Sequence, residues 1–362
     1  MEINVAQPPR HLEALSNQEI SDRIRKIKKN MGDSLLILGH HYQRDEVIDF
    51  ADARGDSFGL AKQAAQTDAR YIVFCGVHFM AETADIVTDD DQKVFIPDVT
   101  AGCFLADCAD IKDVENAWDT LFALNETVIP VSYVNSSVDI KDFCGRHNGI
   151  ICTSSIADNA MQWAFERGQK IFFLPDRNLG LNTAKLKMDI PEDEILVWNP
   201  DQEQGGLSIE ELNTAKVILW NGFCDVHAKF SHQAADELRK KYPDIKLIAH
   251  PECSYELCQK VDKMGSTAQI IDALDKSKAG TKWGIATEKR LVNRLQNQYP
   301  HLDVYFIDNY QPVCKTMSQI TNVHLLYQLQ QIADGREINQ IRVDERKQVY
   351  ANKAIQSMLE LK

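Results

Sequence analysis

The sequence contains no run that approaches the roughly 20 consecutive apolar residues of a membrane-spanning helix. Its first residues, MEINVAQPPRHLEALSNQEI, also lack the basic start and the apolar core of a secretion signal. These two absences predict a cytoplasmic protein that is not associated with a membrane. In that compartment thiols stay reduced, so cysteines are more typical of cores, metal sites and catalysis than of disulfides.

Positive charge is scarce relative to negative charge. The chain has 40 Lys and Arg against 53 Asp and Glu, which gives a formal net charge of -13. A surface of this sign repels phosphate backbones and anionic lipids, so we expect no nucleic-acid partner. An anionic substrate must therefore be bound by local groups.

Several short motifs are absent as well. The sequence has no Walker motif and no GxGxxG after a predicted strand, which gives nucleotide binding little support. It also has no CxxC pair of the kind found in structural zinc and thioredoxin-like centres.

The chain does have nine cysteines, and three of them follow apolar runs that end in turn residues. Such runs are typical of buried strands, and glycine or proline shapes the loop that leads to each cysteine. The runs and their cysteines are KVFIPD (93–98) with Cys103, VILWNG (217–222) with Cys224, and DVYFID (303–308) with Cys314. Three such loops from distant parts of the chain predict a metal site. Cys75 and Cys152 lie inside apolar runs instead, where a small buried side chain is the simpler interpretation.

Strand-like runs alternate with helix-like segments along the whole chain, which predicts an α/β fold with parallel sheets covered by helices on both faces. The runs VFIPD, FFLPD and YFID close three successive groups of three predicted strands, as three similar α/β units would. Apolar strands that end in Asp are common, so chance similarity explains this match equally well. The predicted strands are 35–39, 71–77, 93–98, 128–134, 149–154, 170–176, 246–250, 283–287 and 303–308.

The first strand of each group ends in two polar residues at positions i and i+2. In extended chain these side chains point the same way, and ligands of open α/β sheets bind beyond the carboxyl ends of the strands. Three such pairs predict a polar pocket, although each histidine taken alone is equally typical of a hydrogen-bonded structural residue. The pairs are His40 with Tyr42, Tyr133 with Asn135, and His250 with Glu252.

Three hydroxyl residues stand where predicted helices begin: Ser57, Ser154 and Thr267. Helix N-termini present N-H groups that bind anions. The alternative is that these residues only cap the helices. A further segment, 189–214, has eight acidic and no basic side chains, two prolines and a Gly-Gly pair, and we expect a surface insertion or linker there.

Taken together, the motifs of this chain resemble those of the quinolinate synthases of bacterial NAD biosynthesis. They occur in the same order from about residue 35 to the C-terminal helix, and as a set they are highly specific. The motifs are GHHYQ, GDSFGLA, FMAETA, PDVTAGCFLAD, SYVNSS, TSSI, LPDRNLG, WNGFCDVH, HPEC, MGSTAQII and VDER.

The resemblance implies three similar αβα domains in a pseudo-threefold arrangement, with a [4Fe-4S] cluster and the active site at their common interface. Cys103, Cys224 and Cys314 match the three cluster ligands, and one iron keeps an open position for Lewis-acid chemistry. We expect the domains at 1–112, 113–200 and 201–308, with the C-terminal helices of 309–362 packed on the first.

The implied enzyme is a transferase that condenses iminoaspartate with dihydroxyacetone phosphate to quinolinate, releasing phosphate and water. Its functional partner would be L-aspartate oxidase, which supplies the unstable imine. Glu252 is the candidate general base, and the other matching residues orient groups, move protons or bind substrate. These residues are His40, Tyr42, Ser57, Tyr133, Asn135, Ser154, His227, His250 and Thr267.

Two other classes of protein remain open at this point. A mononuclear zinc or iron hydrolase would use two thiolates and a histidine such as His227, with Glu252 activating water. A non-catalytic iron-sulfur redox sensor would not need the polar pairs. Cys108 and Cys253 are alternative ligands, although strand alternation is expected to turn Cys253 away from Glu252.

Overall fold

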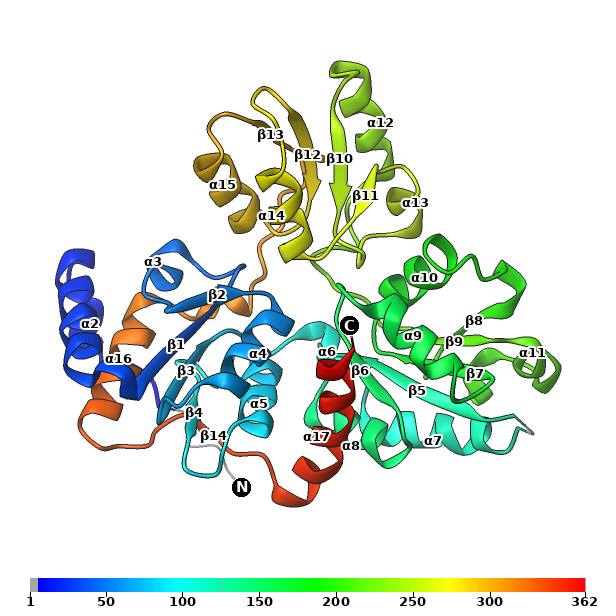
Figure 1. The fold of residues 1–362 in the computed structure, drawn as a ribbon, viewed down its shortest axis with the longest axis horizontal. Helices are drawn as coiled ribbons and strands as arrows, with labels where there is room; N and C mark the ends of the chain where they lie inside the picture. Colours follow the sequence, from blue (N-terminus) through cyan, green and yellow to red (C-terminus); the bar gives the residue numbers. More distant parts are fainter. Residues whose placement is uncertain (1–5, 125, 362) are drawn as a thin grey trace. The chain divides into compact units, whose positions relative to one another are not determined.

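The computed structural model describes residues 6–124 and 126–361 (Figure 1). The chain divides into two compact units. The first comprises Met1–Cys103 with Val313–Asp344, and the second comprises Phe104–Pro312 with Glu345–Lys362. Among the described residues, no helix is long and apolar enough to cross a membrane.

The first unit is built on one five-stranded sheet, here called sheet I, in the order β14-β4-β3-β1-β2. Its neighbouring strands are parallel except for β14, which is antiparallel to β4. The strands are β1 (Leu35–His40), β2 (Ala53–Gly55), β3 (Tyr71–Cys75), β4 (Lys93–Phe95) and β14 (Gln340–Ile341).

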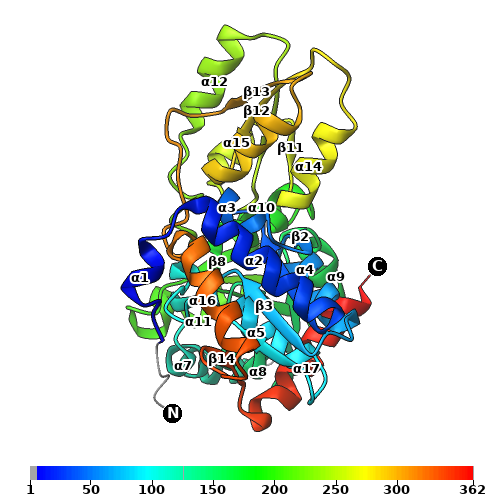
Figure 2. The ribbon, with the colours of Figure 1, turned by 90° about the vertical axis from the view of Figure 1, so that its left-hand side faces the viewer.

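Helices cover both faces of sheet I. Helix α2 packs on α16 at one face, while α4 packs on α5 at the other (Figures 1 and 2). Ser16 and Glu19 form the capping box at the start of α2 that their spacing indicates. The helices are α1 (Arg10–Glu13), α2 (Asn17–Met31), α3 (Asp45–Ile48), α4 (Ser57–Gln66), α5 (His78–Val87) and α16 (Asn322–Ala333).

The second unit contains two sheets in which all neighbouring strands are parallel. Sheet II has the order β6-β5-β7-β9-β8 and sheet III the order β11-β10-β12-β13. The strands of sheet II are β5 (Val128–Tyr133), β6 (Ile150–Cys152), β7 (Lys170–Leu174), β8 (Ile195–Trp198) and β9 (Val217–Trp220). Those of sheet III are β10 (Lys246–Ala249), β11 (Lys263–Met264), β12 (Lys282–Ala286) and β13 (Asp303–Phe306).

The helices of the second unit alternate with these strands, as the sequence pattern predicts for an α/β fold. Helices α6 (Phe104–Asp107), α7 (Ile111–Phe122), α8 (Val138–Arg146), α9 (Ala157–Phe165), α10 (Arg177–Leu186) and α11 (Ile209–Thr214) accompany sheet II. Helices α12 (His232–Lys241), α13 (Tyr255–Cys258), α14 (Thr267–Asp275) and α15 (Lys289–Gln298) accompany sheet III.

One strand order occurs in all three sheets. Numbering the four repeated strands of each sheet in chain order, their spatial order is 2-1-3-4 every time. The repeated strands are β1 to β4 in sheet I, β5, β6, β7 and β9 in sheet II, and β10 to β13 in sheet III. The three sheets therefore share one topology, and their similarity is not a chance match.

The match between VFIPD, FFLPD and YFID nevertheless compares strands that are not equivalent. FFLPD forms β7, the third strand of its sheet, whereas VFIPD and YFID belong to the fourth strands β4 and β13. Asp176 follows β7 because it caps α10, where its side chain accepts a hydrogen bond from Leu179 N. A common capping residue thus produced the misleading similarity.

The acidic segment is part of the fold. It contains two short 3-10 helices (Glu192–Glu194 and Glu203–Gly206) and the edge strand β8, which pairs with β9. The domain boundary expected between residues 200 and 201 lies too early, because β9 is itself hydrogen-bonded to β7.

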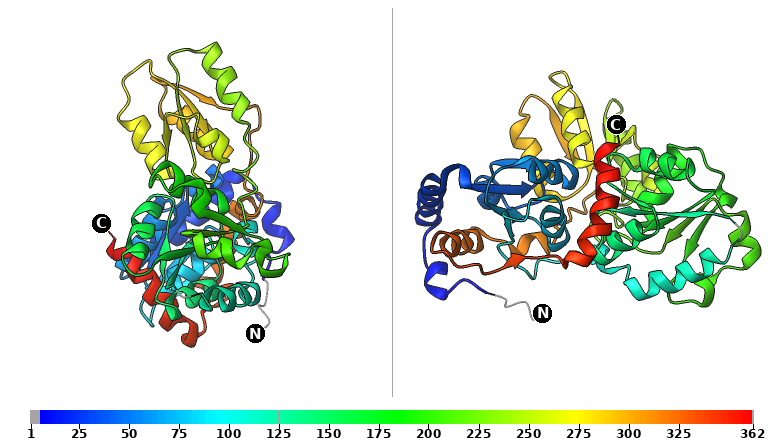
Figure 3. Two further views of the ribbon diagram at one scale, coloured as in Figure 1. Left: turned by 90° about the vertical axis from the view of Figure 1, so that its right-hand side faces the viewer. Right: turned by 60° about the horizontal axis from the view of Figure 1, so that its bottom comes forward.

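The last helix also differs from expectation. Helix α17 (Glu345–Glu360), red in Figure 3, packs on α8 and β6 in the second unit, whereas residues 309–362 were all expected on the first domain. Gly145 permits this close packing, because a Cβ atom there would lie 1.8 Å from the Tyr350 carbonyl oxygen. Helix α17 buries Ala351, Ala354, Ile355 and Met358.

Candidate active site

The predicted site residues occupy equivalent positions in the three sheets. The polar pairs lie at the ends of the first strands, β1, β5 and β10. Ser57, Ser154 and Thr267 follow the second strands, and Cys103, Cys224 and Cys314 follow the fourth strands. All these positions are at the carboxyl ends of parallel strands, where open α/β sheets bind ligands.

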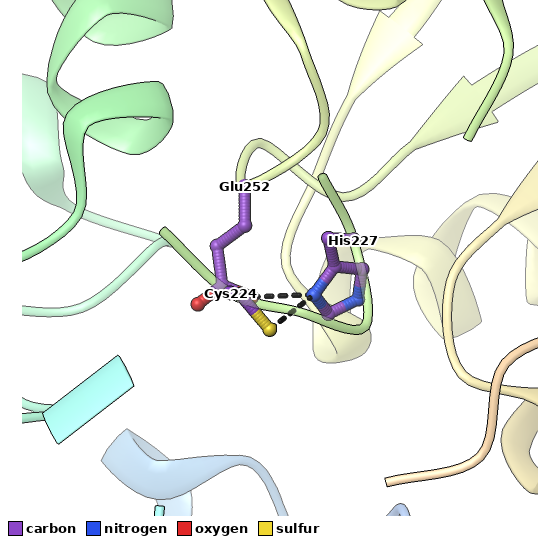
Figure 4. A group of neighbouring side chains, drawn as sticks. All are labelled: Cys224, His227 and Glu252. Carbon is purple, nitrogen blue, oxygen red and sulfur yellow. Dashed lines mark hydrogen bonds and ion pairs between the residues drawn. The ribbon is translucent and has the colours of Figure 1, made fainter. Parts of the chain in front are cut away.

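In the second unit, two of these loops bring three side chains together (Figure 4). Cys224 and His227 come from the loop after β9, and Glu252 comes from the turn after β10. His227 Nδ1 lies 2.7 Å from Glu252 Oε2 and 3.3 Å from Cys224 Sγ. The potential ligand atoms of the three residues all lie within 4.8 Å of one another, so they form a possible metal site.

His250 completes this cluster beside His227. Its Nδ1 atom lies 3.1 Å from Glu252 Oε2, and its ring stacks on that of His227 with centroids 4.4 Å apart. The carboxylate and both histidines are almost fully buried. One carboxylate oxygen is thus within hydrogen-bond distance of two stacked imidazoles, in a site with little access to water.

Charge explains the protonation state of the cluster. Burial acts to raise the pKa of Glu252, but His250 and His227 lower it below its ordinary value, so the group is a carboxylate. Burial, followed by the charge of His250, lowers the pKa of His227. A neutral His227 therefore donates from Nδ1 to the carboxylate.

Thr287 is a contact that the sequence did not single out. It follows β12, the third strand of sheet III, and its Oγ1 atom lies 3.1 Å from His227 Nε2. With the proton of a neutral His227 on Nδ1, the Thr287 hydroxyl donates to Nε2 and fixes the ring orientation. The only sequence signal for this contact is that Thr287 is the last residue of a predicted strand.

The three hydroxyl residues are not helix caps, which removes the simpler interpretation of them. Asp56, Ile156 and Ser266 hold the N-cap positions of α4, α9 and α14. Ser155 donates to Ser266 with an Oγ to Oγ distance of 2.8 Å. This bond joins the sequence neighbours of Ser154 and Thr267, so the starts of α9 and α14 lie together.

Three of the predicted residues carry a buried polar atom with no hydrogen-bond partner among the described residues. The atoms are Asn135 Oδ1, Glu252 Oε1 and Thr267 Oγ1. Buried polar atoms in proteins are nearly always hydrogen-bonded, and exceptions call for an explanation. Each of the three atoms can therefore form a hydrogen bond with a ligand. Tyr133, also buried, lies at the end of β5.

The remaining predicted residues belong to the first unit. His40 and Tyr42 are buried at the end of β1, where their rings meet edge to face with centroids 4.8 Å apart. Tyr42 N donates to His40 Nδ1 over 3.1 Å. Cys103 and Cys314 are half-buried on loops, and Cys314 Sγ lies 3.6 Å from Thr316 Oγ1.

Of the other six cysteines, five are buried and Cys108 is half-buried like the loop cysteines. Burial raises the thiol pKa of all six, to about 12 for Cys75 and Cys258. Thiols with a raised pKa stay protonated and are poor metal ligands. Cys253 lies in the hydrophobic core of sheet III, in the turn after β10. The six are Cys75, Cys108, Cys144, Cys152, Cys253 and Cys258.

Comparison with known proteins gives one consistent result. The model of the family described as "Quinolinate synthetase A protein" matches residues 22–360. The quinolinate synthase of Nocardioides sp. is 48% identical over 362 residues, covering 98% of this chain and 92% of the relative. That of Streptomyces coelicolor is 47% identical over 358 residues, with 98% and 91% covered. That of Geobacillus kaustophilus is 46% identical over 357 residues, with 98% and 96% covered.

Proposed function

The chain belongs to the quinolinate synthase family, and from this premise we propose that it condenses iminoaspartate with dihydroxyacetone phosphate to quinolinate, releasing phosphate and water. The observation that carries the proposal is the buried Glu252 carboxylate, one oxygen of which contacts two histidines, with a cysteine thiol nearby. Ring formation from these two substrates requires protons to be removed from carbon. A desolvated, fixed carboxylate is suited to accept them.

The family implies an iron-sulfur cluster, and we propose that it is a [4Fe-4S] cluster held by Cys103, Cys224 and Cys314. Each of the three is half-buried on the loop after the fourth strand of its sheet, and the other six thiols have a raised pKa. Phe104 and Phe223, the sequence neighbours of two proposed ligands, pack together with ring centroids 5.6 Å apart. Bound with three thiolates, the cluster would supply one iron with an open position as a Lewis acid.

We assign the remaining tasks to protein groups. Glu252 is the base, and His227 and His250 hold its carboxylate in place. Asn135, Ser154 and Thr267 bind polar groups of the substrate. The N-termini of α4, α9 and α14 supply N-H groups for carboxylates and phosphate, which offsets the overall negative charge of the chain. We assign His40, Tyr42, Ser57 and Tyr133 to substrate binding and proton transfer. L-Aspartate oxidase would supply the imine.

The alternative of a mononuclear metal enzyme also has an observation in its favour. Cys224, His227 and Glu252 alone offer three ligand atoms to one ion. That site would contain one thiolate rather than the two considered from the sequence. It would also engage Glu252 as a ligand and leave no carboxylate in this cluster to act as a base.

One anaerobic experiment tests the proposed function. Protein reconstituted with iron and sulfide is mixed with dihydroxyacetone phosphate and with iminoaspartate generated in the mixture, and quinolinate is measured. We expect product together with about four irons and as many sulfides per chain. Cluster-loaded protein that forms no quinolinate contradicts the proposed reaction. One metal ion without sulfide supports the mononuclear site instead.

A further inference from the structure

Helix α10 of sheet II carries polar side chains that face away from solvent. Asn178 is 5% exposed and Asn182 is 0% exposed. The two are four residues apart, so they lie on the same side of the helix. Buried amides of this kind are found where they have specific hydrogen-bond partners.

The partners of these amides are in the turn that carries Glu252. Asn182 Nδ2 donates to the carbonyl oxygens of Pro251 and Cys253, both over 2.8 Å. Asn178 Nδ2 donates to the carbonyl oxygen of Glu252 itself over 3.2 Å. The carbonyls of three consecutive residues after β10 are therefore held by two side chains of helix α10, which packs on a different sheet.

Helix α10 is itself fixed tightly to sheet II. Gly180 lies on the helix between the two asparagines, and a Cβ atom there would come within 2.6 Å of Leu219 Cδ2 and 2.7 Å of Phe173 Cδ1. The side chain of Asp176 caps the start of the helix. A closely packed, capped helix is a rigid support for the turn.

The backbone of the turn determines where the Glu252 side chain points. Its Oε2 atom must lie within hydrogen-bond distance of both His227 and His250. A carboxylate that removes protons from carbon also has to meet the substrate with similar accuracy, because misplacement by about 1 Å lowers rates by about 100-fold. The Cys258 thiol also approaches the Cys253 carbonyl oxygen, but over 3.7 Å and as a weak donor, so the amides provide the stronger hold on the turn.

We propose that Asn182, together with Asn178, is a positioning residue for catalysis: the two amides hold the Pro251–Cys253 backbone so that Glu252 faces its histidines and the substrate. This inference rests on the proposed role of Glu252 as the base. Neither asparagine needs to touch the substrate. Their effect is transmitted through the turn.

The test compares Asn182→Leu and Asn178→Ala with wild type and with Thr183→Val. Thr183 is a buried neighbour on the same helix, so its nearly isosteric replacement controls for loss of a polar group from α10. Each protein is reconstituted with iron and sulfide, and kcat, KM, iron per chain and the melting temperature are measured. Rates are expressed per cluster-loaded chain.

We expect kcat to fall about 10- to 100-fold in Asn182→Leu and by a smaller factor in Asn178→Ala, with KM and iron content little changed. Thr183→Val should keep the wild-type kcat. Asn178→Ala loses a single hydrogen bond and decides the question if Asn182→Leu does not fold. A purely structural role would lower the melting temperature and leave kcat per loaded chain unchanged, which would overturn the inference. Wild-type protein that is loaded but inactive would instead refute the proposed function.

Discussion

Replacing seven of the nine cysteines one at a time by alanine should give two opposite sets of effects. The four cysteines that are 0% exposed are core residues, and removal of a buried sulfur should lower the free energy of unfolding by about 1–2 kcal/mol. For units of this size, that loss corresponds to a fall in melting temperature of about 2–8 °C. Iron content should stay at about four per chain. The four are Cys75, Cys144, Cys152 and Cys253.

Replacement of Cys103, Cys224 or Cys314 should do the reverse. These side chains are half-buried on loops, so their packing contributes little and the free energy of unfolding of the apoprotein should change by less than about 0.5 kcal/mol. Because only three thiolates hold the proposed cluster, the loss of one should reduce iron to near zero after reconstitution. Quinolinate formation should be lost with it.

The assay needs two preparations of each variant. Apoprotein is melted to measure packing, and anaerobically reconstituted protein is analysed for iron and sulfide to measure cluster binding. Full iron retention in Cys224→Ala would refute the ligand set. Iron loss in Cys253→Ala or Cys108→Ala would do so as well, since Cys108 Sγ donates to Phe104 O over 3.3 Å and burial raises its pKa.

Three further outcomes are expected. Glu252→Gln should lower kcat by about 100- to 10,000-fold with iron content unchanged, and a wild-type rate of quinolinate formation would exclude Glu252 as the base. Burial and then the charge of Glu252 raise the pKa of Asp176. Folded Asp176 therefore keeps its proton above about pH 4, where the unfolded side chain loses it. In urea melts of apoprotein, the unfolding free energy of wild type should fall relative to that of Asp176→Asn by about 1.4 kcal/mol per pH unit in that window. The same pH dependence in both proteins would contradict this. Gly145→Ala should displace α17 and lower the unfolding free energy by about 1–3 kcal/mol, because its Cβ would meet Tyr350 O at 1.8 Å; an unchanged melting curve would show that the contact is not close.

The long strands of the fold were predictable because each is a run of apolar residues with a turn at its end. Three of the short strands were not. β2 (Ala53–Gly55), β11 (Lys263–Met264) and β14 (Gln340–Ile341) have two or three residues each and contain polar or small side chains. They are strands only because a longer neighbour offers hydrogen-bonding groups, which is information from the tertiary structure.

In the candidate site, too, some features were predictable from the sequence and others were not. Strand ends identified Cys224, His250 and Glu252 as members of loops that face a ligand region, because alternation and turn residues are local properties. That His227 Nδ1 reaches Glu252 Oε2 depends on how the loop after β9 meets the turn after β10. The contacts of Asn182 likewise depend on the packing of α10, and no local pattern reveals them.

The composition of a segment can also hide its structure. Eight acidic residues between 189 and 214 indicated a surface insertion or linker, and Ile195–Trp198 forms an edge strand within that segment. Charged residues flank this strand rather than interrupt it. Charged flanks are a usual feature of sheet edges, since they discourage pairing with other chains.

The threefold repeat of the 2-1-3-4 strand order limits how many equivalent ligand residues the fold can offer to a cluster. Any given loop of the repeat occurs three times in the chain, so a ligand set that uses one equivalent loop per repeat has three members. A four-iron cluster has four corners to occupy. With the proposed ligand set, three equivalent loops therefore leave one corner of the cluster without a protein ligand. No ligand residue needs to have been lost. Filling that corner would take a ligand from outside the repeated loops.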